Sequence, residues 1–427
     1  MFSKWHWIFL QITRQLWVRA TLIGLLGIVT AALAAIGENV IPWDLPGNIG
    51  ADAVDDILNI IASSMLAVTT FSLSVMTSAF SAATNNVTPR ATKLLMQDQV
   101  TQNVLATFIG SFLFALVGIV MLKTGIYGDR GRVILFVATI AVITLIVITL
   151  IRWIDHLSQL GRVGETTNRV EEAARAAIDA RLKTPLLGGH RRAPNAPPPE
   201  GAEAIASPAT GYIQYIDLET LNECAEALDA DLHLAAVPGA FVHPAHPLLW
   251  IAPERSIDDG TRNKLCSCFA IGQERSYDQD PRFGLAVMSE IASRAMSPAM
   301  NDAGTAIDVI GRLTRLLIRW AEGTEAPQKD DEIAYSRLYV PPIETRDLFD
   351  DAFNLIARDG ANLIEVQIRL QKALHALAQV GDETFHACAH AQSRLALERA
   401  LEAMTSEQDK ARIKKTVDAA RERESGD

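Results

Sequence analysis

The sequence predicts a membrane protein with four transmembrane α-helices followed by a soluble cytoplasmic domain of the α+β class. Uncharged apolar runs long enough to cross a bilayer occur only within the first 155 residues. Hydrophobic residues make up 49% of the 427 positions, a high share for a protein that is soluble throughout. The charge is divided as well, since residues 1–160 carry nine Lys/Arg and eight Asp/Glu, whereas residues 161–427 carry 30 and 42. A nearly neutral half therefore precedes an acidic one.

The transmembrane domain is expected over residues 1–155. Its four uncharged runs cover residues 20–36, 57–89, 99–122 and 133–151. With their flanks, these runs predict transmembrane helices near residues 18–42, 57–88, 99–122 and 131–155. A bilayer core needs about 20 helical residues. A soluble interpretation would require four long buried helices in succession, so the membrane interpretation is favoured.

The distribution of positive charge predicts that both termini lie in the cytoplasm, as in a multi-pass protein of the bacterial inner membrane. With that orientation the inner segments carry eight Lys/Arg and the outer segments three, in line with the positive-inside rule. The first outer loop, residues 37–56, has five acidic residues and no basic one. A cleaved signal peptide ending near "ALA" at residues 32–34 is the alternative. Trp5, Trp7 and Trp17 favour an anchor at the membrane interface instead.

The second predicted helix carries small hydroxyl residues at spacings of 7, 4, 3, 4 and 3, which place them on one face. They are Ser63, Thr70, Ser74, Thr77, Ser81 and Thr84. One interpretation is close packing of helices through small residues, and base rates favour it. The other is a pore lining repeated around the axis of a homo-oligomer. No ionisable residue lies within the four uncharged runs, which counts against a proton- or ion-coupled transporter.

The remainder of the chain divides into three parts. Residues 156–206 predict a continuation of the last membrane helix and then a flexible linker, "GGHRRAPNAPPPEGAEA". Residues 207–340 predict an α+β domain, in which "VPGAFVHPAHPLLWI" at residues 237–251 has the pattern of a β-hairpin. Residues 341–427 have apolar residues at helical spacing, so a helical C-terminal region is expected there.

The stretch "MSPAMNDAGTA", residues 296–306, breaks two amphipathic runs. Pro298 cannot continue a helix, and Asn301 or Asp302 can cap the helix that follows. A functional interpretation adds three charged residues upstream, Arg275, Asp278 and Asp280. If the intervening helix of about 15 residues folded back, these groups would join the turn and hold an anion, a metal or the fold itself. Helix capping explains the residue types alone and is favoured.

Other candidate sites are weaker. His386 and His390 have the i, i+4 spacing of zinc proteases, but Ala387 stands where those enzymes have glutamate. Cys266 and Cys268 are expected on a strand, where burial is the ordinary role of cysteine. We therefore expect no catalytic residue, no metal and no cofactor. The acidic second half also argues against nucleic acid as a partner, because phosphate contacts need clustered Lys/Arg.

Several segments resemble one known family. They are "TPRATKLLMQDQVTQNVLATFIGSFLFAL" after the second helix, "GYIQYIDLETL", "PGAFVHPAHPL", and "GQERSYDQDPRFGLAVMSEIASRAMSPAMNDAGTAIDVIGRL". In these segments, and over nearly the whole chain, the sequence resembles a bacterial inner-membrane family catalogued as domain of unknown function 2254. Gln-Asp-Pro and Ser-Pro-x-x-Asn-Asp are the most specific motifs, although Ala303 stands where a proline is expected. The resemblance implies membrane location and this domain order, and it implies no activity.

Three functions are compatible with these observations. The first is an oligomeric, pore-like channel that the cytoplasmic domain gates, with membrane lipid and other copies of the chain as partners. The second is a membrane-anchored sensor or scaffold whose cytoplasmic domain binds a small ligand, an ion or a protein. The third, least favoured, is a tethered enzyme that uses Arg275, Asp280, Asn301 and Asp302.

Overall fold

A computed structural model describes residues 7, 12–13, 16–36, 51–96, 98–126, 129–159, 161–193, 196–253, 257–324 and 333–425. The contacts within it divide the chain into two compact units. The first, called the apolar unit, comprises Ile8–Asn85 and Thr92–Glu165. The second, called the mixed unit, comprises Met1–Trp7, Asn86–Ala91 and Thr166–Asp427.

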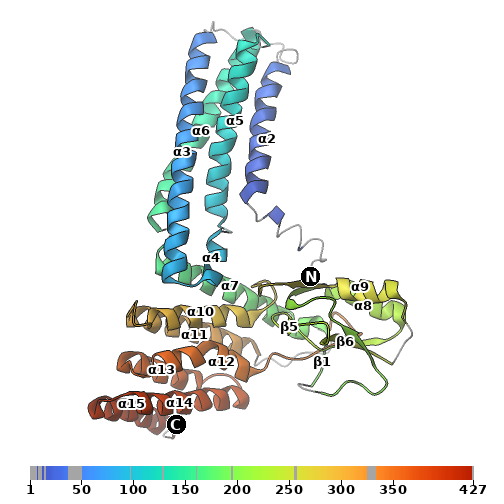
Figure 1. Ribbon diagram of the computed structural model, residues 1–427, viewed down its shortest axis with the longest axis vertical. Helices are drawn as coiled ribbons and strands as arrows, with labels where there is room; N and C mark the ends of the chain where they lie inside the picture. The colour runs from blue at the N-terminus through green and yellow to red at the C-terminus, as the bar shows by residue number, and fades with distance from the viewer. Residues whose placement is uncertain are drawn as a thin grey trace. The chain divides into compact units, whose positions relative to one another are not determined.

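The apolar unit consists of long helices with one short helix between them (Figure 1). Their bounds are α2 (Leu16–Ile36), α3 (Ala51–Asn86), α4 (Pro89–Met96), α5 (Gln99–Lys123) and α6 (Asp129–Gln159). Three of them, α3, α5 and α6, contain stretches long and apolar enough to cross a membrane. The apolar part of α2, Trp17–Leu33, is shorter than a full span. Three of the four predicted spans are therefore supported, and residues 37–42 of the first lie outside the described part of the chain.

Small residues bring α2 and α5 into close contact. A Cβ atom added to Gly27 would lie 2.6 Å from the Gly110 carbonyl oxygen, and one added to Gly110 would lie 2.7 Å from the Ile23 side chain. Only glycine permits helices to approach this closely, and membrane helices use it for that purpose. The core of the unit is apolar and includes Leu58, Phe108, Phe114, Leu135 and Trp153.

The last apolar helix does not continue into the next one. It ends at Gln159, and Gly161 with a φ of 80° precedes α7 (Val163–Lys183). A positive φ costs glycine little and other residues more, so Gly161 marks the break. The predicted continuous extension is therefore wrong at this point.

Two small sheets form the strand-containing part of the mixed unit. The five-stranded sheet has the order β1-β8-β4-β6-β2, and the three-stranded antiparallel sheet has the order β5-β3-β7. The bounds are β1 (His190–Arg191), β2 (Glu203–Ala206), β3 (Gly211–Ile216), β4 (Asp231–Leu234), β5 (Phe241–Val242), β6 (Pro247–Ala252), β7 (Phe269–Gly272) and β8 (Leu338–Val340). In the larger sheet β8 pairs in parallel with β1 and β4, and β6 pairs antiparallel with β4 and β2.

Two expectations about this region need correction. The predicted linker contributes β1 and β2 to the five-stranded sheet, because its backbone groups pair with β8 and β6. The predicted hairpin at residues 237–251 is absent as well. Its two halves, β5 and β6, belong to different sheets, because β5 pairs with β3. Proximity in sequence did not determine the pairing.

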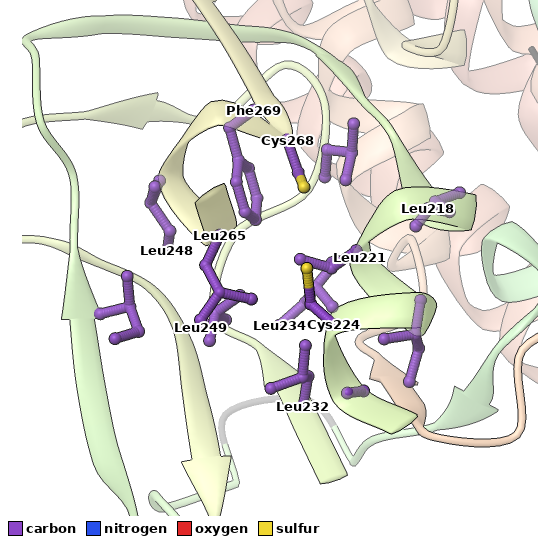
Figure 2. Packing of buried hydrophobic residues seen from close by; sticks show 14 of the residues in the cluster. Leu218, Leu221, Cys224, Leu232, Leu234, Leu248, Leu249, Leu265, Cys268 and Phe269 are labelled. Atoms are coloured by element: carbon purple, nitrogen blue, oxygen red, sulfur yellow. The ribbon is translucent and has the colours of Figure 1, made fainter. Parts of the chain in front are cut away.

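Buried side chains from both sheets and two helices form one core (Figure 2). The helices are α8 (Leu218–Leu228) and α9 (Asp259–Ser267), which begin at the capping residues Asp217 and Asp258. Each carboxylate accepts a hydrogen bond from a backbone N–H of the first turn, the ordinary role of an N-cap. The completely buried Leu221, Leu232 and Leu249 lie at the centre of this core.

Six helices form a stack in the rest of the mixed unit (Figure 1). They are α10 (Pro281–Ala295), α11 (Ala303–Thr324), α12 (Thr345–Asp359), α13 (Ile364–Leu377), α14 (Glu383–Ala403) and α15 (Glu407–Ser425). Helices α10, α12 and α14 contact one another in that order, and so do α11, α13 and α15. Antiparallel pairs that stack on their neighbours are typical of α-solenoids. Amphipathic runs such as α11 bury one face in this stack.

The contact of α7 with α10 allows a direct test of this packing. A Cβ atom on Gly284 would lie 2.3 Å from the Ala174 Cβ. We expect Gly284→Ala to lower the free energy of unfolding by about 1–3 kcal/mol, because the two helices would have to separate. Gly164→Ala is the control, since no atom lies within 4 Å of its added Cβ. Thermal unfolding of the purified protein measures both, and equal midpoints would contradict the packing.

Candidate functional site

The hydroxyl residues of α3 lie on its exposed side. All six predicted members are exposed: Ser63, Thr70, Ser74, Thr77, Ser81 and Thr84. At 3.6 residues per turn they fall within an arc of about 80°. The buried residues of α3 lie on the opposite side of the helix: Val54, Leu58, Ile61, Met65, Ser72, Met76 and Ala83. The face that carries the hydroxyls, called the hydroxyl face, is therefore not used for packing within the apolar unit.

The hydroxyl groups are already bonded within their own helix. Those of Ser63, Thr70, Ser74, Thr77 and Thr84 donate to the carbonyl oxygen four residues earlier, at 2.8–3.0 Å. The hydroxyl hydrogen is occupied by this bond, and the oxygen keeps lone pairs that can accept. The hydroxyl face consequently offers uncharged hydrogen-bond acceptors to whatever lies beside it.

The part of the hydroxyl face from Ser74 to Thr84 differs from a lipid-facing surface. Between Ser74 and Thr84, the exposed residues whose side chains are described are all small: Ser74, Thr77, Ser78, Ser81, Ala82 and Thr84. The exposed side of α6 instead carries large apolar residues: Val137, Ile140, Leu145, Val147, Ile148, Ile151 and Ile154. Large apolar side chains suit contact with lipid, whereas small ones suit close approach of another helix or a polar pathway.

A polar cluster that the sequence analysis missed lies where α5 begins and α6 ends. Asp98 caps α5, and its Oδ2 accepts from the Thr101 backbone N–H at 2.9 Å and from the Thr101 hydroxyl at 2.5 Å. His156 Nε2 lies 2.7 Å from the same oxygen. The Trp153 Nε1–H donates to the buried Ser72 hydroxyl at 2.9 Å, which connects α6 to α3. The pattern Asp-x-x-Thr before an apolar run was the available signal for the cap.

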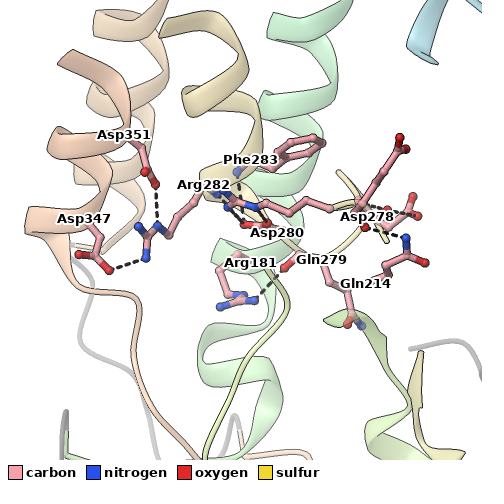
Figure 3. A network of polar contacts seen from close by, with 12 residues as sticks. Arg181, Gln214, Asp278, Gln279, Asp280, Arg282, Phe283, Asp347 and Asp351 are labelled. Atoms are coloured by element: carbon pink, nitrogen blue, oxygen red, sulfur yellow. Dashed lines mark hydrogen bonds and ion pairs between the residues drawn. The ribbon is translucent and has the colours of Figure 1, made fainter. Parts of the chain in front are cut away.

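In the mixed unit, Asp280 is a buried carboxylate surrounded by donors (Figure 3). The Arg275 guanidinium donates two hydrogen bonds to it, from Nε at 2.7 Å and from Nη2 at 3.0 Å. Asp280 also caps α10, accepting from the backbone N–H groups of Arg282 and Phe283. Burial raises the pKa of Asp280, and the charge and hydrogen bonds of Arg275 oppose that rise. Gly239, with a φ of 95°, leaves room for the carboxylate, because a Cβ there would lie 2.3 Å from its Oδ2.

The neighbours of Asp280 join the sheets to the helical stack (Figure 3). The Gln279 side chain accepts from the Ile216 backbone N–H at 2.9 Å and donates to the Ile216 carbonyl at 3.3 Å, as a neighbouring strand would. The buried Arg181 donates to the Gln279 carbonyl at 2.9 Å. Burial lowers the pKa of Arg181 to about 10, an effect that the charge of Asp280 opposes. The Gln-Asp-Pro motif therefore has a structural explanation that needs no ligand.

The remaining charged residues near this motif also have protein partners. Arg282 forms ion pairs with Asp347 and Asp351 of α12, the latter at 2.7 Å. Asp278 accepts hydrogen bonds from the Ser276 hydroxyl at 2.8 Å and from the Trp7 indole N–H at 2.9 Å. The Trp7 ring also stacks on Tyr215, with centroids 5.3 Å apart. Trp7, one of the tryptophans that the sequence assigned to a membrane anchor, thus packs within the mixed unit.

The predicted cluster of five residues is separated into two places. Arg275, Asp278 and Asp280 precede α10, whereas Asn301 and Asp302 follow it. A helix of 15 residues such as α10 is about 22 Å long. The helix does not fold back on itself, so the two groups cannot share a ligand, and the prediction of one combined site is wrong.

The turn at residues 296–306 contains a helix cap. Asp302 Oδ1 accepts from the Thr305 backbone N–H at 3.0 Å, and its Oδ2 accepts from the Thr305 hydroxyl at 2.6 Å. These bonds lower the pKa of Asp302. Asn301 has a φ of 48°, a left-handed conformation that asparagine tolerates better than most residues. Both side chains are exposed.

The other candidates do not assemble into a site. Among the described residues, no group of three or more His, Cys, Asp or Glu side chains is placed to hold a metal ion, at His386 and His390 or elsewhere. Cys266 lies in α9 and Cys268 caps its C-terminus, so their prediction as strand residues is wrong. Burial raises the pKa of the Cys266 thiol, which lowers its reactivity.

Three long apolar helices joined to a unit of sheets and stacked helices define an integral membrane protein with a large extramembrane part. Residues 13–376 match the family described as predicted membrane protein (DUF2254), and the chain belongs to that family. The family resemblance read from the sequence motifs is thereby confirmed.

The chain is similar to mycobacterial proteins whose names assign no activity. An uncharacterized protein of Mycobacterium bovis and uncharacterized proteins from two strains of Mycobacterium tuberculosis are each 29% identical over 253 residues. The matched part covers 57% of this chain and 47% of each relative. The chain thus spans about half the length of the curated relatives it matches. No solved structure matches it.

The cap at Asp302 gives a prediction about stability and pH. We expect Asp302→Ala to lower the free energy of unfolding by about 0.5–2 kcal/mol, and Asp302→Asn, which keeps a capping oxygen, to lower it less. Because the pKa of Asp302 is lowered on folding, its contribution is present above the unfolded pKa of about 3.9 and is lost as the pH falls through the folded pKa.

Hydrogen exchange of the Thr305 amide and thermal unfolding between pH 7 and pH 3 measure this contribution. The difference between Asp302→Ala and the parent protein should shrink toward acidic pH. An Asp302→Ala variant that is as stable as the parent at pH 7, with an equally protected Thr305 amide, would contradict the role of the cap.

Proposed function

We propose that the protein is an oligomeric channel in which α3 helices from several copies surround a common axis and present their hydroxyl faces to it. The observation that supports this most is the position of the hydroxyl face, opposite the packed side of α3 and without large apolar residues from Ser74 to Thr84. A single copy leaves this face uncovered within its own apolar unit. Several copies around an axis would cover it and repeat its acceptors in rings.

The length and chemistry of the hydroxyl face suit a pathway. From Ser63 to Thr84 it extends over 22 residues, a helical rise of about 32 Å, close to the thickness of a bilayer core of about 30 Å. Its hydroxyl oxygens accept without carrying charge, so they can replace part of the hydration shell of a cation or conduct water. The described residues of this face include no ionisable group, so none of them would hold an ion too tightly to release it.

The chain itself links the proposed pore helix to the mixed unit. Helix α3 ends at Asn86, and residues 86–91 already belong to the mixed unit. There the Thr88 hydroxyl donates to Glu290 at 3.1 Å, and the Arg90 guanidinium donates to both oxygens of Glu290 at 2.9 Å. This exposed pair contributes at most about 1 kcal/mol, which is suitable for a contact that opens and closes. We propose that the mixed unit gates the channel through this segment.

The anchored sensor or scaffold is the second candidate, and the same small residues favour it. In that case the hydroxyl faces of two copies would pack directly against each other and leave no pathway. The tethered enzyme is not proposed, because α10 separates the two halves of its predicted site.

If the protein is a channel, two matched substitutions should have different effects on ion flux. Thr77→Leu on the hydroxyl face should abolish most of the ion flux, because a large apolar side chain would narrow and dehydrate the pathway. Thr144→Leu should leave flux unchanged. Thr144 is exposed, donates to the carbonyl of its own helix at 2.9 Å, and lies among the large apolar residues of α6. Flux through liposomes and currents across planar bilayers measure both.

Disulfide crosslinking between copies distinguishes the channel from the anchored sensor or scaffold. Ser74→Cys should form disulfides between copies in either case, and Thr144→Cys should not. In a channel, a water-soluble thiol reagent should modify Ser74→Cys and block flux. Failure of Ser74→Cys to crosslink would refute the oligomer. Crosslinking without flux or reagent access would leave the sensor or scaffold as the function.

The proposed location is the bacterial inner membrane, with both termini in the cytoplasm. The charge bias of the sequence supports this orientation. In a variant whose four cysteines are replaced by alanine, an impermeant maleimide added to intact cells should label Asn48→Cys and not the exposed Glu200→Cys. Labelling at position 200 alone would reverse the orientation.

A further inference from the structure

A groove of about 570 Å³ lies between α13 and α15 in the mixed unit. Its polar lining consists of Gln371, Lys372, His375, Arg412, Lys415 and Thr416. Lys372 and His375 are one turn apart on α13, and Arg412, Lys415 and Thr416 lie within little more than one turn of α15. Among the residues that the structure describes, no carboxylate lines the groove. Its volume lies within the range of about 300–1,000 Å³ that is usual for small-molecule sites.

The cations of this groove are not balanced by carboxylates among the described residues of the groove itself. Residues 161–427 carry more acidic than basic side chains, and arginines such as Arg312, Arg315 and Arg319 are paired with carboxylates of α7. Lys372, Arg412 and Lys415 have no carboxylate partner within the part of the chain that the structure describes. The three side chains are exposed and line the same groove, so an anion bound there would be attracted to all of them.

Buried contacts fix the positions of α13 and α15, the two helices that form the walls of the groove. On α15, Ile413 and Val417 are buried, and Ile413 packs in a small core with Ile364, Ala400 and Met404. On α13, the buried Gln371 amide donates to the Ser393 carbonyl at 3.0 Å and accepts from the Ser393 hydroxyl at 2.6 Å. The two helices thus present their basic residues from fixed backbones, which reduces the entropic cost of binding.

We propose that this groove binds a small molecule that carries two or more phosphate groups. Phosphates match the lining, because Arg412 offers a planar fork of N–H donors and the two lysines offer compact charges. Three permanent cations on facing helices favour a diphosphate over a single phosphate, and the volume exceeds what one phosphate fills. The helix α15 that supplies half of the site lies beyond the residues matched to the family. This inference does not depend on the channel.

Calorimetric titration of the purified full-length protein with inorganic pyrophosphate at low ionic strength tests the proposal. Pyrophosphate should bind, and Lys415→Gln should weaken binding about tenfold, the usual effect of losing one charge-assisted hydrogen bond. Lys414→Gln is the matched control, because Lys414 is the adjacent exposed lysine of α15 and does not line the groove. Lys372→Gln should weaken binding from the opposite wall, and it is the second variant if Lys415→Gln does not fold.

Competition then identifies the source of the phosphates. Displacement of pyrophosphate by ADP supports a free nucleotide or related diphosphate, and displacement by a short-chain phosphoinositide supports a lipid headgroup. The proposal is overturned if pyrophosphate does not bind the parent protein. It is equally overturned if Lys415→Gln and Lys372→Gln bind pyrophosphate as tightly as Lys414→Gln.

Discussion

The mixed unit depends on the compensation of one buried charge, the carboxylate of Asp280. A carboxylate removed from water is costly unless donors surround it. Here the donors come from the preceding loop through Arg275 and from the first turn of α10. The adjacent Gln279 pairs with the backbone of β3, and Arg181 of α7 bonds to the Gln279 carbonyl. Two consecutive residues therefore connect a sheet, α7 and the helical stack, and loss of either would leave buried polar groups unpaired.

A different constraint governs the apolar unit. In a bilayer, polar groups must find partners within the protein, and the hydroxyls of α3 do so by bonding to their own helix. That arrangement lets them remain on an exposed surface without an unpaired donor. Trp153 holds the other side of α3 through Ser72. The helix is thus fixed on one side and open on the other, and the proposed function rests on this asymmetry.

Features set by local sequence could be predicted, and features set by distant pairing could not. Apolar length indicated four spans, of which the structure supports three, and Pro298 followed by Asn301 and Asp302 indicated a cap, which Asp302 forms. In contrast, β5 and β6 are neighbours in sequence and belong to different sheets. One local feature was also missed, since Cys266 was predicted on a strand but lies in α9, which begins after the capping residue Asp258. Lys372 of α13 and Lys415 of α15 line the same groove. Only tertiary packing places these two helices side by side, so the sequence alone could not indicate the groove.

The two proposed sites belong to different units, and residues 86–91, which follow α3, are one segment of the mixed unit. Glu290, which binds this segment, lies on α10, and α10 contacts both α11 and α12 of the stack that reaches α13. Contact alone does not make the groove a regulator of the pore. A ligand shifts an equilibrium only by the difference between its affinities for the two states. A groove ligand would therefore regulate flux only if the spacing of α13 and α15 differs between the open and closed states, whereas equal spacing would make the ligand purely stabilising.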